Sequence, residues 1–159
     1  MSKINTLDNM NKENQFVKSN VSYNEYFIQN WTFELLKSLS KTKKTNINIH
    51  VPKVIHYDQD KKQLTMQKIY GDNLSNIYGE DITDVPIKLI KIIRTLINLM
   101  NYYFVEYIDL TGYNFMLDKN DNLWIIDFGH AKCREKDDIP DPFLLEFIEG
   151  KLSWNPEFK

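Results

Sequence analysis

Three polar residues in the second half of the chain have the types and the spacing for phosphate chemistry. Asn114 follows Asp109 by five residues, and Asp127 comes thirteen residues later, at the end of an apolar stretch. A carboxylate can orient a hydroxyl acceptor, while an amide oxygen and a second carboxylate are hard donors that Mg²⁺ accepts. The set therefore indicates phosphoryl transfer from a nucleotide that is bound together with magnesium.

A β-hairpin is predicted between Asn114 and Asp127. Two apolar stretches, 115–117 and 123–126, flank the polar turn 119–122. A carboxylate directly after a buried strand is unfavourable unless a metal or another cation meets it. This position supports a cationic partner for Asp127.

A long helix is predicted directly before Asp109. Apolar residues recur at helical spacing from about residue 84 to 104, and Pro86 lies in the first turn, where proline is tolerated. A face this wide is typical of a helix that is buried on most sides. The face comprises Ile87, Ile90, Ile93, Ile97, Met100 and Phe104, widened by Leu89, Leu96, Leu99 and Tyr103.

The first part of the chain predicts a small antiparallel sheet. A short strand is expected over 15–20, and two extended segments, 51–57 and 63–69, flank a polar turn. The preceding residues 1–14 are polar and predict a flexible N-terminal arm.

A helix is predicted between the first two of these strands, from Ser22 to about residue 40. Ser22 and Glu25 have the spacing of a capping box. In this motif Ser22 would cap the helix, and the Glu25 side chain would reach back to the Ser22 backbone amide. Glu34 lies along the edge of the apolar face, where a carboxylate costs free energy unless a cation meets it.

The two motifs of the second half resemble those of the protein kinases and their relatives. The stretch 107–114, Tyr-Ile-Asp-Leu-Thr-Gly-Tyr-Asn, resembles the catalytic loop His-Arg-Asp-Leu-x-x-x-x-Asn. The stretch 126–129, Ile-Asp-Phe-Gly, resembles the Asp-Phe-Gly metal motif. Both come in the family order, and the likeness spans about residues 15–130.

The resemblance implies a role for each matched residue. Asp109 would orient the acceptor hydroxyl, Asn114 would ligate Mg²⁺, and Asp127 would bridge Mg²⁺ to the β- and γ-phosphates of ATP. The strand lysine that grips the α- and β-phosphates would be Lys18, held by Glu34 of the following helix.

Two assignments within this set stay open. A solvated surface position is the alternative for Lys18, and Glu25 competes with Glu34 for the helix position, although the capping box already explains Glu25. The resemblance further implies that the gatekeeper and hinge that contact adenine lie at 66–69, with Met66, Gln67 and Ile69 as the contacts.

The chain departs from the family pattern in several places. No glycine precedes Gly71, so the glycine-rich loop over the phosphates is missing or replaced. Tyr107 stands for the usual histidine and Ile108 for the usual arginine. Thirty residues follow Gly129, too few for the large helical lobe that binds peptide substrates. The shortened plan resembles the minimal atypical kinases, such as the RIO group and the small kinase associated with tRNA threonylcarbamoylation.

The expected fold class is α+β, as a minimal protein-kinase-like fold. A reduced N-terminal lobe over about 15–70 would hold a short antiparallel sheet and one helix, and a shortened helical C-terminal lobe would cover about 71–159. The single cysteine, Cys133, and the lack of a long apolar stretch favour a cytoplasmic protein without membrane association. The net charge of −2 does not indicate nucleic acid as a partner.

The favoured function is therefore a kinase-like phosphotransferase that uses ATP and Mg²⁺, either as a serine/threonine-type protein kinase or as an ATP hydrolase. Its protein substrate or partner is not identified by the sequence. The alternative is a pseudokinase that acts as an interaction module, which the missing glycine-rich loop favours. A small-molecule kinase of the aminoglycoside type is a third possibility, and the short C-terminal part argues against it.

Overall fold

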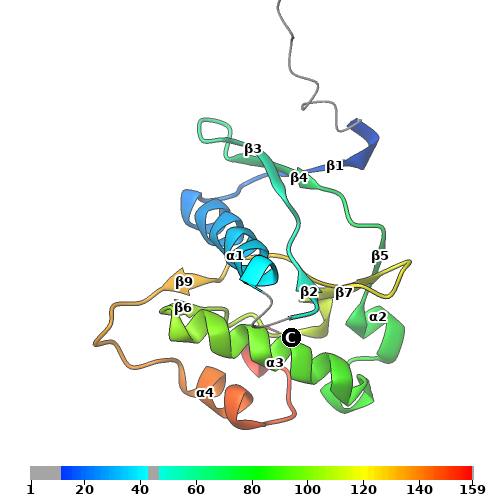
Figure 1. Cartoon of the computed structure of the whole chain (residues 1–159), viewed down its shortest axis with the longest axis vertical. Helices are drawn as coiled ribbons and strands as arrows, with labels where there is room; N and C mark the ends of the chain where they lie inside the picture. Colours follow the sequence, from blue (N-terminus) through cyan, green and yellow to red (C-terminus); the bar gives the residue numbers. More distant parts are fainter. Residues whose placement is uncertain (1–11, 43–46, 159) are drawn as a thin grey trace, which may run out of the picture.

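The N-terminal part of the fold is an antiparallel sheet of three strands beside one helix (Figure 1). The computed structural model describes residues 12–42 and 47–158. The strands lie in the order β1-β4-β3, which confirms the predicted small sheet. Their bounds are Gln15–Lys18 for β1, Val54–Asp58 for β3 and Gln63–Gln67 for β4. Of the predicted arm over 1–14, only 12–14 are among the described residues, and they form the 3₁₀ turn η1 (Lys12–Asn14).

Helix α1 (Tyr23–Thr42) begins where the sequence predicts it and extends two residues beyond the predicted end. The Glu25 amide donates a hydrogen bond of 3.1 Å to Ser22 Oγ, which is the N-cap of the predicted capping box. The other half of the box does not form, because the Glu25 side chain turns toward Lys18 instead. The sequence pattern thus located the helix start correctly and misplaced one side chain.

Helix α3 (Ile87–Tyr102) is the centre of the larger hydrophobic core. Five of its apolar residues are buried, namely Ile90, Ile93, Leu96, Ile97 and Met100. The helix begins later than predicted, because a proline disfavours helical backbone in the residue before it, and Val85 precedes Pro86. Residues 82–84 therefore form the separate 3₁₀ turn η2 (Ile82–Asp84). It ends before Phe104, whose φ of 62° is left-handed.

A second sheet carries the predicted hairpin beside α3. Its strand order is β2-β8-β7-β5, in which β2 runs parallel to β8 and the other pairs are antiparallel. The strands are β2 (Ile49–His50), β5 (Gly71–Asn73), β7 (Phe115–Asp118) and β8 (Leu123–Ile125). Asp118 closes the β7–β8 turn by accepting hydrogen bonds from the amides of Asn120 and Asn122 and from Trp124 Nε1. The predicted hairpin is therefore confirmed.

The C-terminal segment folds back onto the core below α3 (Figure 1). Helix α4 (Pro142–Glu149) buries Leu144 and Phe147, and after it Trp154 stacks on Phe115 with ring centroids 6.0 Å apart. The remaining elements are α2 (Leu74–Tyr78), β6 (Val105–Glu106), η3 (Gly112–Asn114), β9 (Lys132–Cys133) and η4 (Pro156–Phe158).

The mixture of small sheets and helices confirms the expected α+β fold class. The apolar residues form two clusters, a large one around α3 and a small one of Val21, Leu64 and Met66 under the N-terminal sheet. Within residues 12–42 and 47–158, no helix is long and apolar enough to cross a membrane.

Candidate functional site

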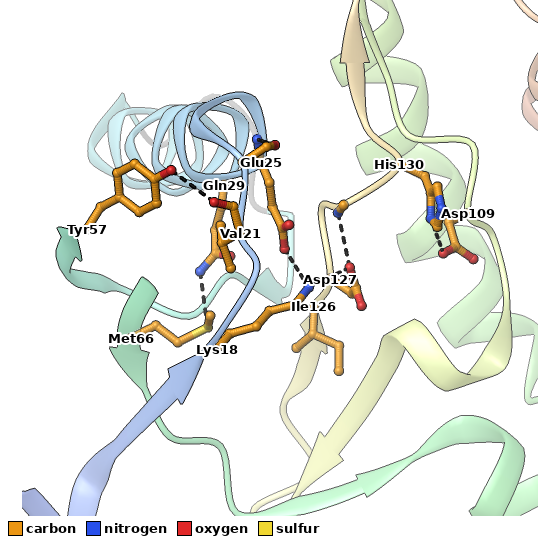
Figure 2. A network of polar contacts seen from close by, with 12 residues as sticks. Lys18, Val21, Glu25, Gln29, Tyr57, Met66, Asp109, Ile126, Asp127 and His130 are labelled. Atoms are coloured by element: carbon orange, nitrogen blue, oxygen red, sulfur yellow. Dashed lines mark hydrogen bonds and ion pairs between the residues drawn. The ribbon is translucent and has the colours of Figure 1, made fainter. Parts of the chain in front are cut away.

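Lys18, at the end of β1, joins two carboxylates that lie far apart in the sequence. Its Nζ is 2.5 Å from Glu25 Oε1 on α1 and 2.9 Å from Asp127 Oδ1 after β8 (Figure 2). Burial alone would lower the pKa of Lys18, but its hydrogen bonds to Glu25 and Asp127 outweigh that effect and raise the pKa above 10.5. The solvated alternative for Lys18 is therefore excluded, and the lysine remains protonated at neutral pH.

The expected pairing of Lys18 with Glu34 is wrong, because the helix partner is Glu25. Nine residues along an α-helix advance about 13 Å, so Glu34 lies beyond the reach of a lysine that contacts the first turn. Glu34 is exposed on α1, whereas the Glu25 side chain is only 7% exposed. Glu25 lies seven residues after Lys18 in the sequence and is the residue that pairs with it. The sequence analysis did not assign this pairing, because the capping box already explained a glutamate at position 25.

The turn after β8 presents Asp127 toward Lys18. Asp127 has a φ of 57°, a left-handed conformation that Asp tolerates better than most residues and that is often found at functional sites. The Gly129 amide donates to Asp127 Oδ1 over 3.0 Å, and Phe128 anchors the turn because it is fully buried. Phe128 packs edge-on against Tyr107 at 5.5 Å.

Burial would raise the pKa of Asp127, but hydrogen bonds from Lys18 and from the Gly129 amide lower it below its ordinary value of 3.8. The side chain is 42% exposed, so it remains accessible to a ligand. Asp127 is therefore an ionised carboxylate at neutral pH, with an exposed oxygen that a cation could meet.

The loop from Tyr107 to Asn114 is tied to the strand that carries Asp127. Asn114 Nδ2 donates to the Asp109 carbonyl over 3.0 Å, and the Ile126 amide donates to the Asn114 carbonyl over 2.9 Å. The Tyr107 hydroxyl donates to the Ile126 carbonyl over 2.6 Å. Burial, and then the nearby carboxylates, raise the pKa of Tyr107 well above 10, so it stays a donor. Tyr107 was noted in the sequence only as a replacement, and its buried hydrogen bond gives it a positioning role.

The carboxylate of Asp109 contacts His130, a residue that the sequence analysis did not select. His130 Nδ1 lies 3.1 Å from Asp109 Oδ2, and the Asp109 side chain is only 15% exposed (Figure 2). Within the described part of the chain, no other group is hydrogen-bonded to this carboxylate. The one sequence signal for His130 is its place directly after Gly129.

A pocket of about 420 Å³ lies between the N-terminal sheet and the β7–β8 hairpin. It is mostly apolar, with the charges of Lys18 and Asp127 in its lining, as is usual for small-molecule sites. It is lined by Phe16, Lys18, Pro52, Met66, Gln67, Lys68, Ile69, Met116, Ile126 and Asp127. Five predicted residues therefore meet here, while Phe16, Pro52, Met116 and Ile126 were missed because they carry no chemical signal in the sequence.

The residues at the polar end fit a magnesium ion that is shared with phosphate groups. Among the described residues, no three His, Cys, Asp or Glu side chains cluster closely enough to hold a metal alone. Mg²⁺ is commonly held by one or two protein oxygens together with substrate phosphates. Asp127 offers an ionised carboxylate and Asn114 an amide oxygen that accepts no hydrogen bond from a described residue.

Comparison with known proteins gives one family and one fold. A family model described as the RIO domain matches residues 3–139. Among solved structures, the kinase PK-1 of Cydia pomonella granulovirus is similar, with a TM-score of 0.53 and 14% sequence identity. The match covers 80% of this chain and 46% of that kinase, so the chain spans less than half of its length. At this identity the likeness shows a shared fold, and comparison with curated proteins gives no significant match.

Proposed function

This chain belongs to the RIO domain family, and on that premise we propose that it binds ATP with Mg²⁺ and transfers the γ-phosphate to a hydroxyl group. The acceptor that we propose is a serine or threonine of a protein that is not yet identified. A cytoplasmic location is part of the proposal, supported by the single free cysteine, Cys133.

The observation that carries the proposal is the double ion pair of Lys18 at the edge of an apolar pocket of nucleotide size. Glu25 holds the ammonium group from the buried side, so Lys18 is oriented before any ligand arrives. A preoriented cation of this kind is suited to α- and β-phosphate oxygens. Met66, Gln67 and Ile69 line the same pocket, and we assign them to the adenine.

The charges at the polar end support a divalent cation. Lys18, Glu25 and Asp127 together carry a net charge of −1, and Asp109 adds a further negative charge nearby. Such a surplus favours Mg²⁺, which in turn offsets the charge of a triphosphate. We assign Asp127 and Asn114 to the metal, and Asp109 to the orientation of the acceptor hydroxyl.

The same arrangement assigns each protein group a task in the transfer. Lys18 neutralises charge on the phosphates, and Asp127 and Asn114 would hold Mg²⁺, which would reduce the charge repulsion between the γ-phosphate and the incoming oxygen. Tyr107 keeps the loop of Asp109 in register with Asp127 through the Ile126 carbonyl. The chemistry supplied by Mg²⁺ is the stabilisation of charge that develops on the leaving phosphate.

The test is Mg-dependent turnover of radiolabelled ATP by the wild type and by two matched variants. Asp127→Asn removes the metal-binding charge, and we expect it to lower turnover by about 100-fold or more. Asp121→Asn is the control, because Asp121 has a φ of 60° close to the 57° of Asp127 and is exposed in the β7–β8 turn. Both positions tolerate Asn in the left-handed conformation. The two variants therefore differ in whether the lost negative charge lies at the candidate site or in the β7–β8 turn.

The outcome with the wild type decides between the two candidate functions. Labelled protein or released phosphate that disappears with a chelator supports the kinase. The rival is a pseudokinase, favoured by the lack of any glycine before Gly71 that could cover the phosphates. A protein with no turnover and no change in melting temperature at millimolar Mg-ATP would be a pseudokinase.

A further inference from the structure

His130 has a hydrogen-bond geometry that none of the assigned roles uses. Its Nδ1 lies 3.1 Å from Asp109 Oδ2. An ionised carboxylate can only accept hydrogen bonds, so the imidazole must carry its hydrogen on Nδ1 and donate it to Asp109. In the neutral ring, Nε2 then carries a free lone pair. The side chain is 60% exposed, so the ring is accessible to a substrate or to water.

Two hydrogen bonds at Ala131 fix the turn that carries His130, and one aromatic side chain packs against the imidazole ring. The Ala131 amide donates to the Phe128 carbonyl over 3.0 Å, which closes the turn that carries His130. Asn24 Nδ2 of α1 donates to the Ala131 carbonyl over 2.9 Å. Phe158 of η4 packs against the imidazole with ring centroids 4.9 Å apart. The ring is therefore positioned by parts of the chain that are distant in sequence.

Carboxylates dominate the charges around His130. Asp109 contacts it directly, and Asp127 lies near enough that a positive charge on His130 lowers the pKa of Asp127. From η4 the neighbouring ring is that of Phe158, which brings no charge. The exposed group beside Asp109 is thus an imidazole backed by a carboxylate, the arrangement that activates hydroxyl nucleophiles in serine hydrolases.

We propose that His130 is a catalytic residue of the phosphotransferase proposed above, and that its Nε2 takes the proton of the acceptor hydroxyl. The O–H bond of the acceptor breaks and its proton passes to Nε2, while the acceptor oxygen bonds to the γ-phosphorus. The bond from the γ-phosphorus to the bridging oxygen breaks, and its electron pair leaves with ADP. Asp109 holds Nδ1–H and stabilises the imidazolium, which then releases its proton to water.

A histidine suits this task better than an aspartate acting alone. General-base catalysis needs a basic atom within reach of the proton, and histidine is the side chain most often used for it. Asp109 then orients the acceptor hydroxyl through His130, whose Nδ1 it contacts.

The test compares His130→Ala with a matched histidine variant. We expect kcat to fall by about 100-fold in His130→Ala, since general-base catalysis contributes at least this much. KM for ATP should stay within about twofold, because His130 does not line the nucleotide pocket. His56→Ala is the control, as His56 is exposed on β3 away from the site. Circular dichroism spectra check that both variants are folded.

The acid side of the pH profile gives the deciding measurement. Wild-type kcat should fall on the acid side of the profile, because a base that is already protonated cannot take the proton of the acceptor. His130→Asn keeps an N–H donor for Asp109 and therefore the local structure, but it has no basic nitrogen. We expect this variant to be slow and to lose that acid limb.

The outcomes separate a failure of the His130 inference from a failure of the proposed function. If the wild type turns over ATP and His130→Asn keeps its rate and its acid limb, His130 has only a structural role and the inference is overturned, while the proposed function stands. If the wild type turns over no nucleotide at all, the proposed function itself fails and this inference fails with it. A slow His130→Asn enzyme without the acid limb supports the inference.

Discussion

At the scale of single residues, Lys18 contacts two carboxylates that differ in burial, and this difference separates their tasks. The Glu25 side chain is 7% exposed and has no other described partner, so it is a permanent support for the lysine. The Asp127 side chain is 42% exposed, so it can exchange part of its contact with Lys18 for a metal ion. We therefore expect the loss of Glu25 to act through Lys18, and the loss of Asp127 to act through the metal ion that we propose.

The matched pair Glu25→Gln and Glu34→Gln tests the support of Lys18. Both substitutions remove one charge from the same helix, but only Glu25 contacts the lysine. In Glu25→Gln the ammonium group loses its charged anchor, and we expect KM for ATP to rise about tenfold. Glu34→Gln should leave KM unchanged. A larger effect in Glu34→Gln than in Glu25→Gln would contradict the pairing.

The residues that could be predicted from the sequence are those whose chemistry shows in their type and spacing. Asp109, Asn114 and Asp127 were selected in this way, and their catalytic and metal-binding roles stay predictions. Lys18 was left open by the sequence, and its contact with Asp127 is seen in the structure. Glu25 was misassigned because two patterns, a capping box and an ion pair, both explain a glutamate at the start of a helix. His130 was passed over because its contact with Asp109 depends on a turn and on the distant Phe158.

At the scale of elements, the β7–β8 hairpin sets the spacing between Asn114 and Asp127. Its strands pair in register, with Phe115 opposite Ile125. The helix was predictable because it has a long apolar pattern, and the hairpin was predictable because two apolar stretches flank a polar turn. Two-residue strands such as β2 and β9 were not, since a strand that short has no periodicity of its own and is defined by its partner.

Asp118 should be the main polar support of the hairpin. Its carboxylate accepts hydrogen bonds from two turn amides and from Trp124 Nε1, which is part-buried. Asp118→Ala leaves these donors without their partner, and we expect the free energy of unfolding to fall by about 1–2 kcal/mol. Lys119→Ala, a change at the exposed neighbouring position, should alter it by less than about 0.5 kcal/mol. Urea denaturation of both variants measures the difference, and equal stabilities would refute this role.

At the scale of the whole molecule, the ion pairs of Lys18 connect the N-terminal sheet to the larger core. The sheet has its own small hydrophobic cluster, and the β1 strand contributes Lys18 while the turn after β8 contributes Asp127. The pocket that we propose for the nucleotide lies between these two parts, so the same contact shapes the pocket and joins the parts. The sequence could predict both parts, but their relative placement depends on the Lys18 contacts.

This connection gives the stability of the protein a defined dependence on pH. The pKa of Lys18 is raised above 10.5, so its contribution is fully present below that pH and is lost as the pH rises through the higher folded-state value. The pKa of Asp127 is lowered below 3.8, so its contribution is present above that pH and is lost as the pH falls through the lower folded-state value. Both contributions are complete between these limits.

Lys18→Met should therefore change the stability curve at both ends. It removes the alkaline decline that Lys18 causes, and it weakens the acid decline because Asp127 loses the ammonium group that lowers its pKa. At neutral pH the variant should be less stable, since Glu25 stays buried without its cation. Lys61→Met is the matched control, because Lys61 is 71% exposed and pairs only with Asp58 across a surface turn. Urea denaturation from pH 3 to 11 measures both curves, and a Lys18→Met curve parallel to that of Lys61→Met would mean that the two parts are joined by packing alone.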